Sequence, residues 1–158
     1  SNGKNGCNRS MIKIICIGKL KEDYLKKAME EYKKRITKYS KIEMIELEDE
    51  SNGNILEKEK TKILKYINEK DYVITLEIDG SSIDSMELSK KIESIYLNYS
   101  NITFIIGGSY GLHDDIKKRS NYALSFSKLT FPHQLFRVML LEQIYRSFKI
   151  MHHETYHK

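Results

Sequence analysis

Short apolar segments alternate with amphipathic helical segments along almost the whole of this chain, which has 158 residues. The apolar segments are rich in isoleucine, and most end at glycine or at Asp-Gly. Alternating strands and helices are typical of one α/β domain, with a mainly parallel sheet and helices on both faces. The expected strands are 12–17, 42–47, 72–78, 102–106 and 123–127, and the expected helices are 24–38, 55–68, 84–99, 114–120 and 132–151.

The ends of the chain differ from this pattern. Residues 1–10, SNGKNGCNRS, are polar and unpatterned, so the folded domain is expected to cover 11–158, after an artificial or disordered leader. No apolar run approaches the ~20 residues of a membrane span, and no signal peptide is evident. Cys7 and Cys16 lack metal-ligand spacing and are expected to be free thiols. These features favour a cytoplasmic protein.

The charge permits a nucleic-acid partner without proving one. The net charge is +5, a value that many cytosolic domains share. His152, His153 and His157 gather at the C-terminus, but only Glu154 stands near them as a further ligand. The sequence therefore predicts no metal site, and a basic tail that contacts a polyanion is the preferred interpretation.

Three segments have the composition of a ligand pocket at the carboxyl ends of parallel strands, where ligands bind in such sheets. They are 76–80, 106–111 and 125–131. Gly107 and Gly108 permit close backbone approach, so a bulky residue at Gly107 is expected to enter the pocket and prevent binding. Ordinary strand-to-helix turns are the alternative. The dinucleotide fingerprint and the P-loop are both absent.

The segment 132–151 is apolar on nearly every side. Such a helix must be covered all round, so it either meets a second subunit or forms the centre of the core. Glu142 and Arg146 have the spacing of a helical ion pair. Arg137 stands among apolar residues and needs a partner, which makes it a candidate for an interface or substrate contact.

Three stretches together resemble the RlmH family of large-subunit ribosomal RNA methyltransferases, part of the SPOUT superfamily. They are FIIGGSYGL from Phe104, SFSKLTFPHQLFRVMLLEQIYRSFKI from Ser125, and the terminal YHK. The resemblance covers 11–158. It implies a fold with a trefoil knot, a homodimer, and S-adenosyl-L-methionine as cofactor. It also implies methylation of N3 of a pseudouridine in helix 69 of 23S rRNA, within the assembled ribosome.

The resemblance also implies roles for particular residues. His157 is the candidate to take the imide proton, Tyr156 to orient the base and Arg137 to stabilise developing charge. The tail of one subunit is expected near the cofactor of the other. The stretch 152–155 departs from the family, whose members often have a glycine and a small residue there. The cofactor-binding positions carried over are Leu76, Gly107, Gly108, Phe126, Ser127, Lys128, Leu129, Thr130 and Phe131.

Two other classes of protein remain as alternatives. A non-catalytic module could bind ribosomal RNA, although the intact cofactor turn and the terminal YHK argue against it. Calorimetry with S-adenosylmethionine separates this module from the enzyme. A small-molecule enzyme that uses a dinucleotide is disfavoured, because the fingerprint is missing.

Overall fold

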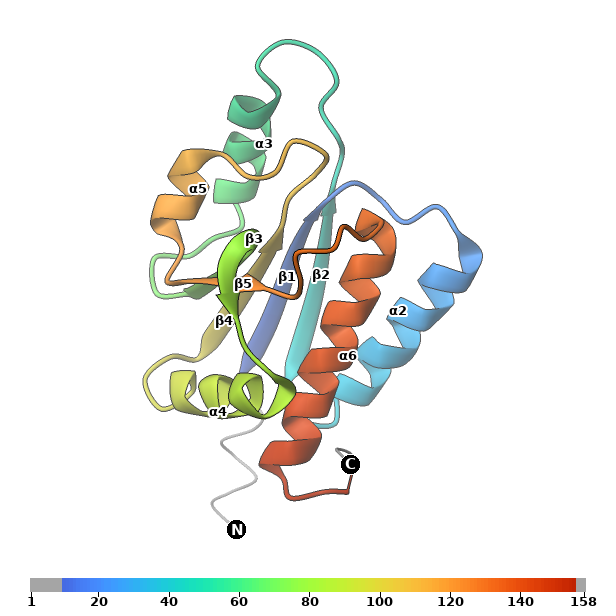
Figure 1. The fold of residues 1–158 in the computed structure, drawn as a ribbon, viewed down its shortest axis with the longest axis vertical. Helices are drawn as coiled ribbons and strands as arrows, with labels where there is room; N and C mark the ends of the chain where they lie inside the picture. Colours follow the sequence, from blue (N-terminus) through green and yellow to red (C-terminus); the bar gives the residue numbers. More distant parts are fainter. Residues whose placement is uncertain (1–9, 156–158) are drawn as a thin grey trace.

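The computed structural model describes residues 10–155, and these form a five-stranded sheet with helices on both faces (Figure 1). The elements in chain order are β1 (Met11–Ile17), α2 (Asp23–Ile36), β2 (Lys41–Leu47), α3 (Ile55–Leu64), β3 (Tyr72–Ser82), α4 (Ser85–Ile95), β4 (Asn101–Ile106), α5 (Asp114–Arg119), β5 (Tyr122–Ser125) and α6 (His133–Met151).

The sheet has the strand order β2-β1-β4-β3-β5, and all its pairings are parallel. The predicted α/β class with a parallel sheet is therefore confirmed. Because every strand runs the same way, the carboxyl ends of all five strands lie at one edge of the sheet. Between two parallel strands the chain must run back from the carboxyl end of the first strand to the start of the second, and the helices form these crossover connections.

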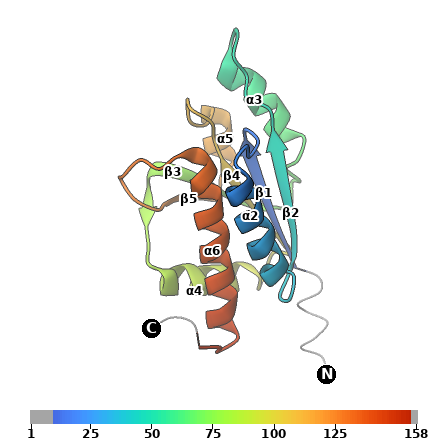
Figure 2. The same cartoon turned by 90° about the vertical axis from the view of Figure 1, so that its right-hand side faces the viewer.

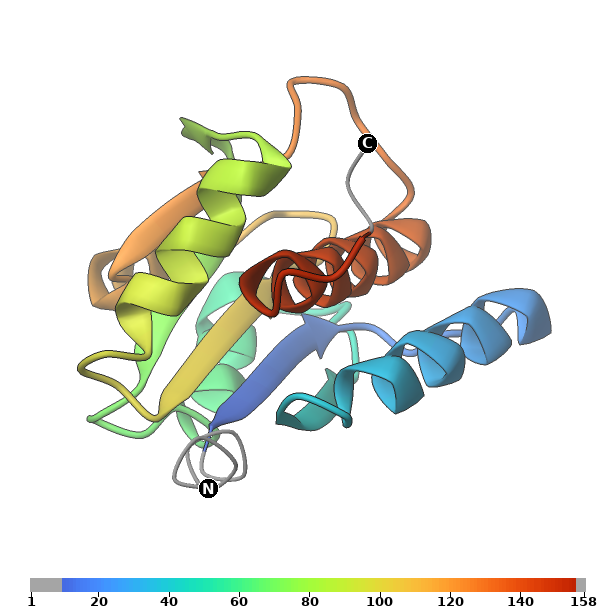
Figure 3. The ribbon, with the colours of Figure 1, turned by 90° about the horizontal axis from the view of Figure 1, so that it is seen from below.

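The two faces of the sheet carry separate apolar cores. α2, α4 and α6 cover one face, over a core that includes Phe104 and Leu140. α3 and α5 cover the other face, over a smaller core around Ile105 and Ile116. Figure 2 shows α6 beside α2, and Figure 3 shows α6 lying between α2 and α4. Neighbouring residues of β4 thus point into different cores, as the two-residue period of a strand requires.

Most element boundaries agree with the sequence pattern, and β3 is the clearest exception. Its predicted end at Ile78 is wrong, since the strand continues to Ser82 with a shift of register between Leu76 and Ser81. Gly80 lies within this extension, where an added Cβ would stand 2.8 Å from the backbone of Ala123. A glycine that looks like a strand terminator instead permits two strands to approach closely.

Smaller differences concern helix ends and the leader. α3 and α4 end before the predicted 68 and 99, because their last turns tighten into non-helical turns. Ser10 belongs to the folded part, since its hydroxyl bonds to Ser40 Oγ at 3.2 Å. Asp84 and Glu87 form a capping box at the start of α4. Within residues 10–155, no helix is long and apolar enough to cross a membrane.

Candidate functional site

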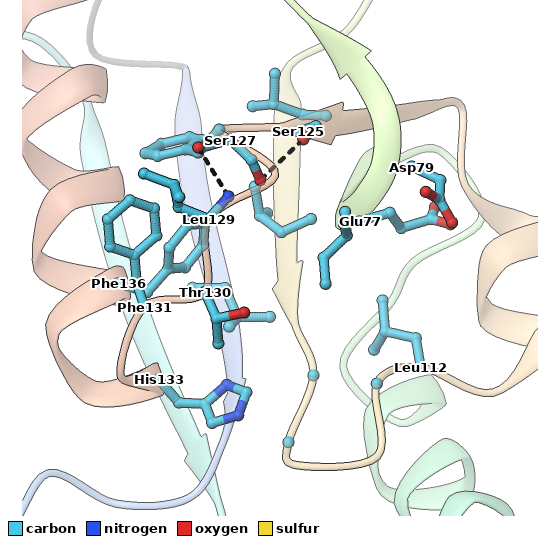
Figure 4. A pocket seen from close by; sticks show the side chains of 18 of the residues that line it. Glu77, Asp79, Leu112, Ser125, Ser127, Leu129, Thr130, Phe131, His133 and Phe136 are labelled. Atoms are coloured by element: carbon cyan, nitrogen blue, oxygen red, sulfur yellow. Dashed lines mark hydrogen bonds between the residues drawn. The ribbon is translucent and has the colours of Figure 1, made fainter.

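A cavity of about 430 Å³ lies at the carboxyl ends of β3, β4 and β5 (Figure 4). This volume is within the usual range for small-molecule sites. The walls come from the end of β3, from the turn after β4, and from the loop between β5 and α6. Three segments that are far apart in the sequence therefore meet at one cavity.

Almost all the residues proposed from the sequence to bind the cofactor line this cavity. Lys128 is the exception: it is exposed, and it does not belong to the lining. The structure thus brings the three predicted segments together. The proposed residues that line the cavity are Leu76, Gly107, Gly108, Phe126, Ser127, Leu129, Thr130 and Phe131.

The turn after β4 is built from its own backbone. Gly111 has φ of 77°, which favours glycine, and its N–H donates to the carbonyl of Gly108 at 3.1 Å. A Cβ added at Gly107 would stand 2.6 Å from the carbonyl oxygen of Gly111. A side chain at Gly107 would therefore require the turn itself to move, and the expectation that a bulky residue there prevents binding stays a prediction.

The loop between β5 and α6 supplies an apolar wall. The Leu129 N–H donates to Ser127 Oγ at 3.0 Å, which closes a tight local turn. The rings of Phe126 and Phe131 lie 4.8 and 6.3 Å from the ring of Phe136, which lies in the first turn of α6. A wall of this kind suits a flat, weakly polar group such as a purine base.

Charged groups lie on the other side of the cavity. Figure 4 shows Glu77 and Asp79 opposite Leu129 and Phe136, and Lys117 of α5 also belongs to the lining. Sequence reasoning included the two carboxylates in a strand-end segment but assigned them no role. Their position in the sequence could have indicated them, since both follow the last fully buried residues of β3.

Arg137 does not line the cavity. Its side chain is 1% exposed, and its Nη1 donates to Glu46 Oε2 at 3.0 Å and to the Gly18 carbonyl at 3.1 Å. The same Glu46 oxygen accepts the Leu20 N–H at 2.7 Å. The structure thus supplies the partner that a buried charge needs, and this partner connects α6 to β2 and to the loop after β1.

The apolar character of α6 has two sources. Its buried face packs on the sheet between α2 and α4, as a central core helix does. Its outer side still carries Leu135, which is exposed, and Met139 and Ile150, which are half-buried. Met139 also lines a second cavity of about 490 Å³, between α6 and the start of α4. These apolar side chains thus remain only partly covered by the described part of this chain, and the Glu142–Arg146 ion pair lies between Met139 and Ile150 along the helix.

The C-terminal segment after α6 is held by one carboxylate. Glu154 accepts the hydroxyl of Tyr39 and an ammonium proton of Lys149, both at 2.7 Å. The candidate catalytic residues Tyr156 and His157 lie outside the described residues. Within residues 10–155, no cluster of three histidine, cysteine or carboxylate side chains could hold a metal ion.

Comparison with known proteins gives one consistent result over nearly the whole chain. A family model described as "Predicted SPOUT methyltransferase" matches residues 11–157. The ribosomal RNA large subunit methyltransferase H of Clostridium kluyveri is 53% identical over 157 residues, which are 93% of this chain and 99% of that protein. The protein of the same name from Clostridium botulinum strain Alaska E43 is 54% identical over the same shares of the two chains.

A solved structure shares the fold. The crystal structure of tRNA (m1G37) methyltransferase from Aquifex aeolicus superposes with a TM-score of 0.50, covering 87% of this chain and 70% of that chain. The sequence identity is 13%, so this likeness concerns the fold alone.

Proposed function

Because this chain belongs to the SPOUT methyltransferase family, among the large-subunit ribosomal RNA methyltransferases H, we propose that it methylates ribosomal RNA with S-adenosyl-L-methionine. In detail, the proposed acceptor is N3 of a pseudouridine in helix 69 of 23S rRNA, within the assembled ribosome in the cytoplasm. The observation that carries the proposal is the cavity at the carboxyl edge of the sheet, built by the three segments expected to hold the cofactor.

The cavity fits this cofactor in chemistry as well as in size. The wall of Phe126, Phe131 and Phe136 suits the adenine ring, and the backbone of the glycine turn offers polar groups close to the ligand. The carboxylates opposite that wall can accept from ribose hydroxyls or from the ammonium group. When bound, S-adenosylmethionine supplies a methyl group on a positively charged sulfur.

The protein's part in the reaction is mainly to position the acceptor base. The imide proton must leave N3, and we assign its removal to His157, with Tyr156 orienting the base. Alignment of the nitrogen with the methyl group can itself supply much of the rate enhancement. Arg137 was the candidate for charge stabilisation, but its burial against Glu46 favours a structural role.

The proposal includes a homodimer that forms through α6, with the tail of one subunit near the cavity of the other. The exposed Leu135 and the half-buried Met139 and Ile150 support this arrangement, as does the second cavity, which Met139 lines. Sedimentation that detects only monomer at micromolar protein would contradict it. The family's trefoil knot belongs to the same proposal, and an experimental map continuous from β4 to α6 would test the threading.

The decisive experiment uses labelled cofactor and ribosomes from a strain that lacks the modification. We expect one methyl group per ribosome, located at N3 of a helix 69 pseudouridine by mass spectrometry of nuclease fragments. Free 23S rRNA serves as the comparison substrate. Transfer to a different nucleotide would disprove the assigned acceptor, and a failure of calorimetry to detect S-adenosylmethionine binding would favour the non-catalytic module.

The role of the tail needs its own variant. Deletion of residues 156–158 should abolish transfer while the affinity for S-adenosylmethionine stays within a few fold, because these residues are proposed to act on RNA and not on the cofactor. The matched single variants are His157→Ala and Tyr156→Phe. Full activity of the deleted protein on ribosomes would remove the assignment of His157.

A further inference from the structure

One carboxylate at the cavity is held in place by a buried hydroxyl. Thr75 is fully buried in β3, and its Oγ1 donates to Glu77 Oε2 at 2.6 Å. Ser120 Oγ lies 2.8 Å from the same Thr75 oxygen and accepts the Tyr122 N–H at 3.2 Å. A carboxylate cannot donate, so the single Thr75 proton is directed to Glu77. The Glu77 side chain is thereby fixed by a chain of contacts that begins in the backbone of β5.

The other carboxylate oxygen of Glu77 has no partner among residues 10–155. Because Glu77 lines the cavity, this oxygen is available to a ligand there. The carboxylate of Asp79 also belongs to the lining but is exposed, and no hydrogen bond within the described chain holds it. Of the two, Glu77 alone is pre-oriented. A pre-oriented acceptor contributes more to binding, because no side-chain freedom is lost when the ligand arrives.

We infer that Glu77 accepts a hydrogen bond from a ribose hydroxyl of the adenosyl group, and that Thr75 is its positioning residue. This inference rests on the proposed function. A fixed carboxylate is a general solution for holding a ribose hydroxyl, as in dinucleotide-binding sites. The adenine base is proposed to pack on the wall of Phe126, Phe131 and Phe136, which lies across the cavity from Glu77 (Figure 4). The sugar is the part of an adenosyl group that adjoins the base.

The test is calorimetry with S-adenosylhomocysteine, which measures binding without turnover. Glu77→Gln should bind about tenfold more weakly than the wild type, since a charge-assisted hydrogen bond is replaced by a neutral one. The same comparison is made with the 2′-deoxy and 3′-deoxy analogues. With the analogue that lacks the contacted hydroxyl, Glu77→Gln and the wild type should bind within about twofold of each other.

Asp79→Asn is the matched comparison, because it removes the same charge from the same side of the cavity. Its loss of affinity should be smaller than that of Glu77→Gln. Equal losses of affinity in the two variants would mean that the negative charge of the cavity, and not a specific Glu77 contact, strengthens binding. Unchanged affinity of Glu77→Gln would also overturn the inference. A loss that persists with both deoxy analogues would assign the contact to the amino or ammonium groups. If the wild type binds no S-adenosylhomocysteine, the proposed function itself fails.

Thr75→Val tests the positioning role. Valine keeps the shape of the buried side chain but cannot donate, so affinity should fall about threefold, and Thr75→Ser should restore it. Thermal unfolding is measured in parallel. If Thr75 has a purely structural role, the melting temperature should fall, and the loss of affinity should be the same for S-adenosylhomocysteine and its deoxy analogues. If Thr75 positions Glu77, the loss of affinity should disappear with one of the analogues.

Discussion

At the scale of single residues, the environment decides what a chemical group does. Arg137 had the appearance of a functional cation in the sequence, but in the structure it holds Glu46 and the Gly18 carbonyl beneath α6. Its Nε has no partner within the described chain. Burial of an ion pair is costly, and removal of one partner leaves the other charge uncompensated. The pair therefore connects α6 to the loop after β1.

Arg137→Met should lower the free energy of unfolding by about 2–4 kcal/mol, because Glu46 then loses its charge partner. Urea denaturation measures the change. The control on the same helix is Arg146→Met, which breaks a partly exposed i,i+4 pair with Glu142 and should cost under about 1 kcal/mol. If Arg137→Met keeps its stability but loses turnover, Arg137 has the catalytic role after all.

Cys16 is predicted to be chemically silent in the folded protein. It is buried in β1, and burial raises the pKa of its thiol to about 12, an effect that the nearby charge of Arg137 only partly offsets. The thiolate is the reactive form, so labelling requires unfolding. In a Cys7→Ser variant, iodoacetamide at mildly alkaline pH should label Cys16 only in concentrated urea. Rapid labelling in native buffer would show that β1 opens locally.

At the scale of elements, the turn after β4 depends on two glycines for different reasons. At Gly107 an added methyl group meets backbone atoms of Gly111, whereas at Gly111 nothing stands within 4 Å but φ is positive. Gly107→Ala should therefore destabilise the protein by roughly 2–3 kcal/mol, and Gly111→Ala by about 1 kcal/mol. Thermal or urea unfolding measures the loss of stability in each of the two variants. The reverse order would mean that backbone strain outweighs the steric clash.

At the scale of the whole molecule, Glu154 connects the C-terminal segment to the turn after α2 through Tyr39. The hydrogen bond from Lys149, which has the larger effect, and the hydrogen bond from Tyr39 lower the pKa of the Glu154 carboxyl to about 2. Burial, and then the bond to Glu154, raise the pKa of Tyr39 well above its usual value. Tyr39 also stacks on Phe148 of α6, with ring centroids 5.7 Å apart. These contacts join the C-terminal ends of α2 and α6, which lie side by side (Figure 2).

This pair should give a stability that depends on pH at both extremes. The contribution of Glu154 is present above its unfolded pKa near 4.5 and is lost as pH falls towards 2. That of Tyr39 is present below its unfolded pKa near 10 and is lost at higher pH. The difference in unfolding free energy between the wild type and Tyr39→Phe should be constant from about pH 5 to 9 and shrink outside that range. A difference that does not vary with pH would contradict the pairing.

The sequence by itself determined the class of fold and most of the residues that line the cavity at the carboxyl edge of the sheet. Periodicity is a local property, and it placed strands and helices close to their observed positions. The three strand-end segments were found in the same way, because parallel strands must share one carboxyl edge. The resemblance of 104–158 to a methyltransferase family is equally a property of residue order.

Only the tertiary structure decided which groups meet. The partner of Arg137 is Glu46, 91 residues away in sequence, and no local pattern links the two. Gly80 and Gly107 looked like residues that end strands or admit a ligand, yet backbone from β5 and from Gly111 stands against them. The fixed orientation of Glu77 likewise depends on Thr75 and Ser120, which the pairing of β3 with β5 brings together. Such contacts depend on distances in space, which residue order alone does not specify.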